Sequence, residues 1–418
     1  MTPECRRGIY SARVTVTLAD VQAARQVLGD VALVTPIQRS RWLEQVLGVP
    51  VRLKCENLQR AGSFKIRGAY VRISRLSLED RAAGVVAASA GNHAQGVALA
   101  ASLLDTRAVV FMPNGAPIPK ENATRGYGAE VHFAGASIDE ALVSARAYAD
   151  RTAAVLIHPF DHADVVAGQG TLGLELLEQV PDAATVVIPC GGGGLLAGVA
   201  LVVKASRPDV TVVGVQAEGA NSYQPSLVAG EPVPLASMST MADGIAVGRP
   251  GDVPFASVAT HVDEMLTVSE ESMSQALLLL LERAKQVVEP GGAAAVAALL
   301  EHRDRADLFC KGPVVAVLSG GNIDPLLLMQ VVRHGLAAAG RYLSITVTIP
   351  DRPGQLASLL THLGGAKVNV LDVVHQRVSA ALHVDEVAVA LQLETRGDPH
   401  RLQVLSDLRN AGFVVAES

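Results

Sequence analysis

From residue 18 to residue 339 the sequence alternates short apolar, β-branched runs with longer segments of helical periodicity. This alternation is typical of parallel sheets, because successive parallel strands must be joined by a long crossover, usually a helix. The predicted strands are 51–54, 85–88, 108–112, 131–133, 186–190, 210–215 and 314–318. A chain of 418 residues is too long for one ordinary core, so we expect an α/β protein of two or three domains.

The pattern changes after Gly340. Residues 344–349 alternate strictly, residues 351–354 read as a turn, and leucines 356, 359, 360 and 363 recur at helical spacing. Further strands are expected at 367–374 and 387–393, and Asp398 and Pro399 suit the N-cap and first position of a closing helix. The order β-α-β-β-α-β predicts a ferredoxin-like α+β domain at 342–418, separate from a first domain at 1–338.

Composition excludes several classes of protein. The net charge of −6 and the absence of a lysine or arginine run argue against nucleic-acid binding. The segment 1–17 lacks the apolar stretch of a signal peptide, and runs such as 276–281 are too short to cross a bilayer, so we expect a cytoplasmic protein without a membrane partner. Cysteines 5, 55, 190 and 310 form no CxxC pair, which indicates neither a zinc site nor a disulfide framework.

Three predicted strands run into glycine-rich turns, at 89–93, 191–194 and 319–322. Ligands of open parallel sheets bind beyond the carboxyl ends of the strands, so the three turns are expected to face one cleft. The four glycines at 191–194 precede a helical run and can aim backbone N–H groups at a phosphate. Residues 192–197 also fit the dinucleotide pattern GxGxxG/A, with Glu218 as a ribose-binding acid, so an NAD-binding dehydrogenase stays open at this point.

Lys65 lies in the run 62–69, which begins with Gly62-Ser63 and ends with Gly68-Ala69, so small residues stand on both sides of it. A lysine that loses solvation can form a Schiff base with a carbonyl cofactor, whereas the alternative is a solvated lysine at a helix start. A dinucleotide leaves Lys65 and the turns at 89–93 and 319–322 without a role. Pyridoxal phosphate uses all of them, since its aldehyde needs an amine, its phosphate a glycine nest, and its ring hydroxyl and pyridine nitrogen each a partner.

Segments 54–59, 62–69, 89–96, 191–195, 243–247, 289–292 and 319–322, in this order, resemble the threonine/serine dehydratase branch of the fold-type II pyridoxal phosphate enzymes. The tail from Tyr342 resembles an ACT domain. The resemblance implies a two-lobed catalytic domain of parallel sheets, like the tryptophan synthase β subunit, with a smaller lobe of roughly residues 55–155 inserted in it. It also implies a regulatory role for the tail.

The resemblance assigns roles to individual residues. Lys65 would form the Schiff base, Asn92 would bind the ring hydroxyl, Ser319 would meet the pyridine nitrogen, and Gly244 and Glu289 would line the pocket. Glu289 capping a helix is the alternative for that residue. The phosphate would lie on Gly191, Gly192, Gly193, Gly194 and Leu195, and the substrate carboxylate on Ser89, Ala90, Gly91, Asn92 and His93. His93 either orients this loop or transfers protons.

One departure from the family concerns a divalent cation. Related serine racemases and some dehydratases bind a cation through acidic residues at positions that match Gln216, Ala220 and Ser222 here. Hard cations prefer charged oxygen ligands, so we expect no metal, although Glu218 lies nearby.

The implied reaction is β-elimination, with neutral Lys65 as the base that removes the α-proton. It would convert L-threonine to 2-oxobutanoate and ammonia, and L-serine to pyruvate, with a place in isoleucine biosynthesis expected. L-serine dehydratase, 3-hydroxyaspartate dehydratase and serine racemase remain alternatives, because small pocket changes separate them. An inactive amino-acid sensor is a further alternative, against which the intact Lys65 argues. The sequence does not decide between threonine and serine, or between biosynthetic and degradative pathways.

The tail is expected to bind an amino-acid effector such as isoleucine. The resemblance points to the turn after its first strand, with Asp351, Arg352, Gly354, Gln355 and Asn369 as candidate contacts. The alternative is a domain used only for contact between subunits. We expect a homodimer or homotetramer.

Overall fold

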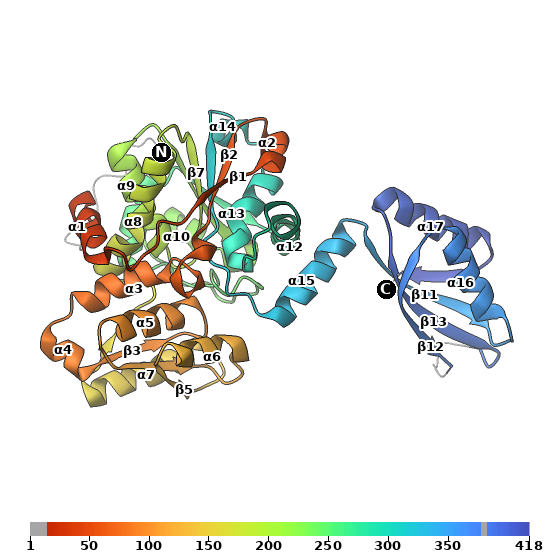
Figure 1. Ribbon diagram of the computed structural model, residues 1–418, viewed down its shortest axis with the longest axis horizontal. Helices are drawn as coiled ribbons and strands as arrows, with labels where there is room; N and C mark the ends of the chain where they lie inside the picture. Colours follow the sequence, from red (N-terminus) through yellow and green to blue (C-terminus); the bar gives the residue numbers. More distant parts are fainter. Residues whose placement is uncertain (1–14, 378–382, 418) are drawn as a thin grey trace. The chain divides into compact units, whose positions relative to one another are not determined.

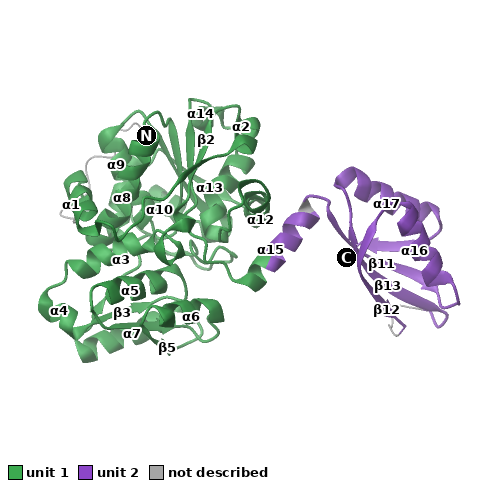
Figure 2. Cartoon of the chain, in the orientation of Figure 1, with its two compact units in different colours: residues 1–328 green, residues 329–418 purple. Residues whose placement is uncertain are grey.

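The computed structural model describes residues 15–377 and 383–417, and the chain divides into two compact units, Met1–Leu328 and Met329–Ser418 (Figure 2). The division falls inside helix α15 (Pro325–Ala338). The boundary predicted at 338–342 lies at the end of the same helix. The segment 1–14, which carries Cys5 and most of the stretch inspected for a signal peptide, lies outside the described residues.

A six-stranded sheet organises the larger lobe of the first unit (Figure 1). Its order is β1-β2-β10-β7-β8-β9, and all neighbours are parallel except β1, which runs antiparallel to β2. Helices α8 and α9 cover one face and α12 and α13 the other, so the central strands are buried on both sides. The strands are β1 (Ile37–Arg39), β2 (Val51–Lys54), β7 (Thr185–Pro189), β8 (Thr211–Ala217), β9 (Glu264–Val268) and β10 (Val314–Val317).

Its helices are α1 (Leu18–Leu28), α2 (Arg41–Leu47), α8 (Ala163–Gln179), α9 (Gly194–Ser206), α10 (Tyr223–Ala229), α11 (Asp252–His261), α12 (Glu270–Leu279), α13 (Pro290–Glu301) and α14 (Ala306–Phe309). Short helical turns are η2 (Glu56–Leu58), η3 (Arg60–Gly62), η4 (Glu218–Ala220) and the π-helical η5 (Leu280–Ala284). Helix α1 begins with a capping box between Thr17 and Asp20, the local signal expected at a surface helix.

The smaller lobe, at the bottom of the first unit in Figure 1, is built on a four-stranded parallel sheet of order β5-β4-β3-β6. Every residue of β3 is buried, because Val85 and Ala87 pack under α3 and α5 while Val86 and Ala88 pack under α7. The elements are α3 (Lys65–Ser74), α4 (Leu78–Ala83), β3 (Val85–Ala88), α5 (Asn92–Leu103), β4 (Ala108–Met112), α6 (Ile118–Gly126), β5 (Glu130–Phe133), α7 (Ile138–Thr152) and β6 (Val155–Leu156).

The second unit contains a four-stranded antiparallel sheet of order β12-β13-β11-β14. Leu359 and Leu363 of α16 and Leu405 and Leu408 of α17 pack on one core with its strands. The order β11 (Tyr342–Pro350), α16 (Gln355–Gly365), β12 (Asn369–Gln376), β13 (Glu386–Glu394), α17 (Asp398–Asn410), β14 (Val414–Glu417) is ferredoxin-like, as predicted. One detail is wrong: Gly397, not Asp398, is the N-cap of α17.

All seven strands predicted for the first unit are present, with ends within two residues of the prediction. Strands β1, β6 and β9 were not predicted, and each lies at the edge of its sheet. Cys55 and Cys190 are buried free thiols and Cys310 is an exposed one, so the described cysteines form no disulfide. Over residues 15–377 and 383–417, no helix combines the length and the apolar character needed to cross a membrane.

Candidate active site

A cavity of about 860 Å³ lies between the two lobes of the first unit. Its walls are the loops that follow β3, β7 and β10, together with the segment 234–249 of the larger lobe. Every residue predicted to bind cofactor or substrate in this unit lines it, including Lys65, residues 89–93, residues 191–195, Gly244 and Ser319. The structure thus brings together segments that are up to about 250 residues apart in the chain.

Lys65 is the first residue of α3, and its side chain is partly buried in this cavity. Its Nζ donates to the carbonyl oxygen of Pro159 at 2.9 Å and lies 5.2 Å from the centre of the Phe64 ring. Burial lowers the pKa of the Lys65 amine to about 8, and the Glu289 carboxylate only partly opposes this effect. A sizeable fraction of the amine is therefore neutral, and able to act as a nucleophile or base, near pH 7.5.

The glycine loop joins β7 to α9 and opens that helix at Gly193, which has φ +98°. A Cβ at Gly193 would stand 1.8 Å from the Tyr223 hydroxyl, and one at Gly192 would stand 2.4 Å from the Phe160 ring. The positive φ and the buried Tyr223 hydroxyl favour glycine at 193, the Phe160 ring crowds a larger residue at 192, and no side chain caps α9. The free N–H groups at the start of α9 form a cradle for an anion.

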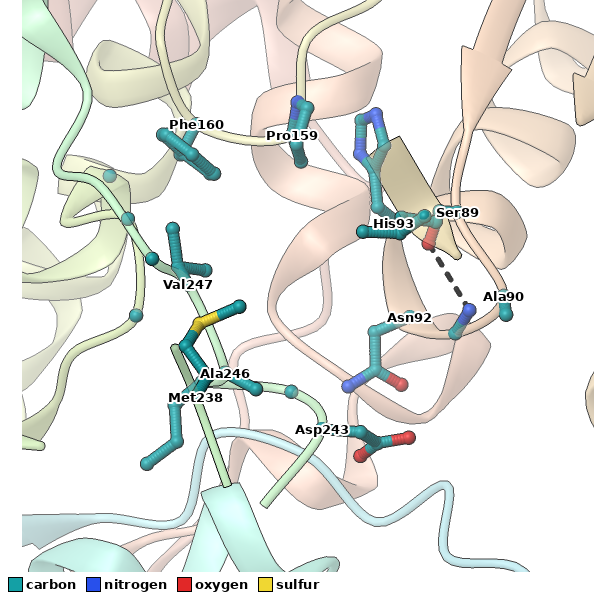
Figure 3. A pocket seen from close by; sticks show the side chains of 18 of the residues that line it. Ser89, Ala90, Asn92, His93, Pro159, Phe160, Met238, Asp243, Ala246 and Val247 are labelled. Carbon is teal, nitrogen blue, oxygen red and sulfur yellow. Dashed lines mark hydrogen bonds between the residues drawn. The ribbon is translucent and has the colours of Figure 1, made fainter. Parts of the chain in front are cut away.

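The loop after β3 opens α5 in the same manner. Gly91 is the N-cap of α5, with no side-chain cap, and its N–H donates to Ser89 Oγ at 3.1 Å (Figure 3). His93 is buried, with Nε2 2.7 Å from the carbonyl oxygen of Ile157. Burial and the nearby Lys65 ammonium lower the pKa of His93 to about 3. His93 is therefore neutral near pH 7 and bonded to the backbone, and the uncapped start of α5 can receive a second anion.

Glu289 precedes α13 and is nine-tenths buried or more. The alternative that it caps this helix is wrong, because no side-chain cap hydrogen bond is present. Instead its Oε1 accepts from Asn92 Nδ2 at 2.5 Å. Burial raises the pKa of the Glu289 carboxyl to about 7, and the Asp243 carboxylate adds to the rise.

Ser319 lies two residues beyond the end of β10 and is buried at the wall of the cavity. Its hydroxyl is among the groups that line the cavity, where it can bond a ligand. A hydroxyl at this position can donate or accept, but it carries no charge.

The predicted site lacked Lys120 of α6, and it did not give Asp243 as the partner of this lysine. The Lys120 ammonium is buried at the cavity and pairs with the Asp243 carboxylate, which joins the smaller lobe to the loop before Gly244. Their separation of 123 positions leaves no local sequence signal for this pair.

A buried ionic network supports the start of α3. Arg67 bonds Glu56 through Nε at 2.9 Å and Glu175 through Nη1 at 2.6 Å, and Lys54 bonds Glu175 at 2.8 Å. Two cations and two carboxylates balance, which is the arrangement that makes buried charges tolerable. Because Arg67 follows Lys65 by two residues on α3, the network holds the lysine's backbone to the larger lobe.

The positions considered for a cation are occupied by neutral side chains. Gln216 Nε2 donates to the Ala220 carbonyl oxygen and to Ser222 Oγ, both at 3.3 Å, while Gln216 Oε1 accepts from the Tyr223 N–H. The Ala220 carbonyl oxygen and Ser222 Oγ, which could otherwise ligate a metal, thus accept hydrogen bonds from the Gln216 amide. In the described part of the chain, no group of three or more His, Cys, Asp or Glu side chains is arranged to hold a metal.

In the second unit, the structure separates the candidate effector residues. Asp351, Arg352, Gly354 and Gln355 form the turn between β11 and α16, with Gly354 at φ +90°. Asn369 begins β12, and its Nδ2 donates to Glu394, which pairs with Tyr342 at the other end of β11. Since β11 and β12 run in the same direction, the start of one lies far from the end of the other. Within one copy of the chain, Asn369 does not join the turn.

Comparison with known proteins agrees with this arrangement. Residues 30–320 match the family model described as pyridoxal-phosphate dependent enzyme. The chain is similar to an L-threonine ammonia-lyase of Geobacter sulfurreducens, with 45% identity over 91% of this chain and 94% of the relative. It is also 44% identical to an L-threonine ammonia-lyase of Thermotoga maritima, over 96% of this chain and 99% of the relative.

A solved structure of maize serine racemase has a TM-score of 0.73, at 35% identity over 78% of this chain and 99% of that chain.

The residues present fit the cofactor of this family. The partly neutral Lys65 amine can meet an aldehyde, and the glycine cradle at α9, where a Cβ would meet Phe160 or Tyr223, can hold a phosphate. Ser319, which lines the same cavity, can offer its hydroxyl to a ring nitrogen. From the family match and this chemistry, the chain belongs to the pyridoxal-phosphate dependent enzymes of fold type II.

Proposed function

We propose that this enzyme is an L-threonine ammonia-lyase, which converts L-threonine to 2-oxobutanoate and ammonia and accepts L-serine as a second substrate. The observation that carries the proposal is the Lys65 amine, held with a lowered pKa in one cavity with two uncapped helix N-termini, at α5 and α9. The two L-threonine ammonia-lyases that match nearly the whole chain support the same reaction.

Each part of the cavity has a role in this proposal. Pyridoxal phosphate, when bound, supplies an aldehyde for Lys65 and an acceptor for electrons. Gly191 to Leu195 hold its phosphate, Asn92 bonds its ring hydroxyl, Ser319 bonds its ring nitrogen, and Gly244 lines the wall. The loop of Ser89, Ala90, Gly91, Asn92 and His93 binds the substrate carboxylate with N–H groups at the start of α5.

Lys65 removes the α-proton of the substrate, for which the amine must be neutral. The lowered pKa provides this form near neutral pH. A serine at the ring nitrogen does not stabilise a positive ring as a carboxylate would, which weakens electron withdrawal and favours prompt loss of the β-hydroxyl.

The charges of the cavity favour substrates with a neutral side chain. Besides Lys65, the cations among the lining residues are Lys120 and Arg249. Lys120 is paired with Asp243, and Arg249 bonds Asp252 at 2.9 Å. A second carboxylate, as in 3-hydroxyaspartate, would have to compete with these partners, so threonine and serine fit better.

Serine racemase is the second candidate, favoured by the likeness to the maize enzyme. An NAD-binding dehydrogenase is set aside, because the chain belongs to the pyridoxal-phosphate family. The two remaining reactions differ in product: racemisation of L-serine yields D-serine, and elimination yields pyruvate.

The test begins with the visible absorption spectrum of the purified protein with pyridoxal phosphate. L-threonine and L-serine are then added separately, and 2-oxo acid, ammonia and D-serine are measured. We expect 2-oxobutanoate from L-threonine at the highest rate, and no turnover by Lys65→Ala. D-serine without 2-oxo acid would reject the lyase, and ordinary turnover by Lys65→Ala would reject the assigned base.

For the second unit we propose binding of a small amino acid such as isoleucine at the turn of Asp351, Arg352, Gly354 and Gln355, with Asn369 joining only from another copy in a homodimer or homotetramer. The match to the Thermotoga relative covers 96% of this chain and therefore extends into this unit. Inhibition by isoleucine would place the reaction in isoleucine biosynthesis. Kinetics that are unchanged across a wide isoleucine range would reject this effector. Cytoplasmic location stays a prediction.

A further inference from the structure

Three side chains from three distant segments form a chain of hydrogen bonds at the wall of the cavity, which we call the amide relay: Asn322, Asn92 and Glu289. Asn322 Nδ2 donates to the carbonyl oxygen of Ala61 at 2.7 Å and to Asn92 Oδ1 at 2.8 Å. Asn92 Nδ2 then donates to Glu289 Oε1 at 2.5 Å. The relay therefore connects the segment before Lys65, the start of α5 and the start of α13.

The polarity of the relay is fixed at one end by the backbone. The Ala61 carbonyl can only accept, so it requires the nitrogen of Asn322 on its side. The same Asn322 nitrogen donates to Asn92, so Asn92 must accept with its oxygen. The Asn92 nitrogen then points to Glu289. A reversed Asn92 amide would set its nitrogen against the Asn322 nitrogen and lose that bond, and it would set its oxygen against Glu289, which can donate only when protonated.

Glycines make the room that the relay needs. A Cβ at Gly62 would stand 2.2 Å from Asn322 Oδ1, and one at Gly320 would stand 2.4 Å from Glu289 Oε1 and 3.0 Å from Asn92 Nδ2. Gly244 lies against the same carboxyl, at 3.1 Å from its would-be Cβ. Gly62 lies three residues before Lys65, so the relay packs directly on the segment that carries the amine. Backbone on two sides thus encloses these side chains closely.

We propose that Asn322 and Glu289 are positioning residues that fix the Asn92 amide with its nitrogen toward Glu289, so that Asn92 offers the cofactor's ring oxygen an N–H group and not a lone pair. The inference rests on the proposed role of Asn92 as the partner of the ring hydroxyl. Neither Asn322 nor Glu289 needs to touch the cofactor for this function. Their effect on binding passes through the orientation of Asn92.

The test reverses the relay without changing its size. In Asn322→Asp, the residue loses its donors, and Asn92 must turn its nitrogen toward the new carboxylate. In Glu289→Gln, the side chain can still accept from Asn92, so the polarity is kept. In the double variant Asn322→Asp/Glu289→Gln, Asn92 donates to Asp at 322 and accepts from Gln at 289, which restores two of the three bonds with reversed polarity.

We expect Glu289→Gln to bind pyridoxal phosphate within about 3-fold of the unchanged protein, and Asn322→Asp to bind it at least about 10-fold more weakly. The double variant should regain part of the melting temperature that Asn322→Asp loses in the cofactor-free protein. Its affinity for the cofactor should stay at least about 10-fold weak, and its visible absorption maximum should be displaced. Asn221→Asp, whose side chain bonds only Gln224 at the surface, is the matched control.

Recovery of both stability and cofactor affinity in the double variant would overturn the proposal, because the relay would then be a structural contact whose polarity does not matter. Affinity of Asn322→Asp within about 3-fold of the unchanged protein would also overturn it. These readouts need no substrate. A failure of the threonine reaction would appear separately, as the absence of 2-oxo acid from the unchanged protein.

Discussion

The lowered pKa of Lys65 can be tested by the pH at which the cofactor-free protein captures pyridoxal phosphate. Only the neutral amine attacks an aldehyde, so the capture rate follows the neutral fraction. With a pKa of about 8, roughly a quarter of the amine is neutral at pH 7.5. A solvated lysine of pKa 10.5 would be neutral in about one molecule in a thousand, so burial raises the reactive fraction by about 200-fold.

The assay records the rise of visible absorbance after rapid mixing of cofactor-free protein with excess pyridoxal phosphate between pH 6.5 and pH 10.5. The ratio to the rate with N-acetyl-lysine, measured in the same buffers, cancels the cofactor's own ionisation. We expect this ratio to fall steadily above pH 8, where Lys65 is already neutral and the model amine is not. Lys65→Ala should show no such rise of visible absorbance.

Glu289→Gln adds a second check, because the Glu289 carboxylate raises the pKa of Lys65. Removing this charge should lower the pH at which the capture rate is half its maximum, relative to the unchanged protein. If the capture rate of the unchanged protein reached half its maximum only near pH 10.5, as for N-acetyl-lysine, desolvation would be refuted as the cause of the reactivity of Lys65.

Three further predictions concern the surroundings of the site. Gly193→Ala should bind pyridoxal phosphate at least about 10-fold more weakly in an equilibrium titration, because φ +98° and the Tyr223 hydroxyl both oppose a side chain there; unchanged affinity would contradict the assigned cradle. Arg67→Met should lower the free energy of unfolding by about 3–5 kcal/mol in urea, since buried Glu56 loses its paired cation and Glu175 keeps only Lys54, whereas the exposed Arg39→Met should cost less than about 1 kcal/mol. His93 has a pKa of about 3 in the folded protein against 6.5 when solvated, so the unfolded chain binds more protons between these pH values and the free energy of unfolding falls as the pH drops below 6.5. His93→Gln should reduce the slope of this free energy against pH by up to about 1.4 kcal/mol per pH unit. An unchanged slope would show that His93 is not held neutral.

The central strands could be predicted from sequence because strands buried on both faces read as continuous apolar runs. The edge strands β1, β6 and β9 lack this signature: β1 reads Ile-Gln-Arg, β6 has only two residues, and β9 is only partly buried. Burial depends on a strand's place in the sheet, which the local sequence does not encode.

In the second unit, too, local patterns predicted the order of the elements but not the relative directions of the strands. Strict alternation and turn residues predicted its ferredoxin-like order correctly. They did not show that Asn369 lies at the opposite end of the sheet from Asp351, because that follows from the direction of β12 after the α16 crossover. Strand direction is a property of the assembled sheet.

For the active site, the sequence by itself determined which groups are available: the amine of Lys65, the glycines before α9, the loop after β3 and the hydroxyl of Ser319. Their order along the chain identified the cofactor family. Only the tertiary structure decided their electrostatic state and orientation. Desolvation of Lys65, the Lys120–Asp243 pair and the polarity of the Asn92 amide all arise between segments roughly 90 to 260 positions apart, because folding brings their charges and donors within a few ångströms of one another.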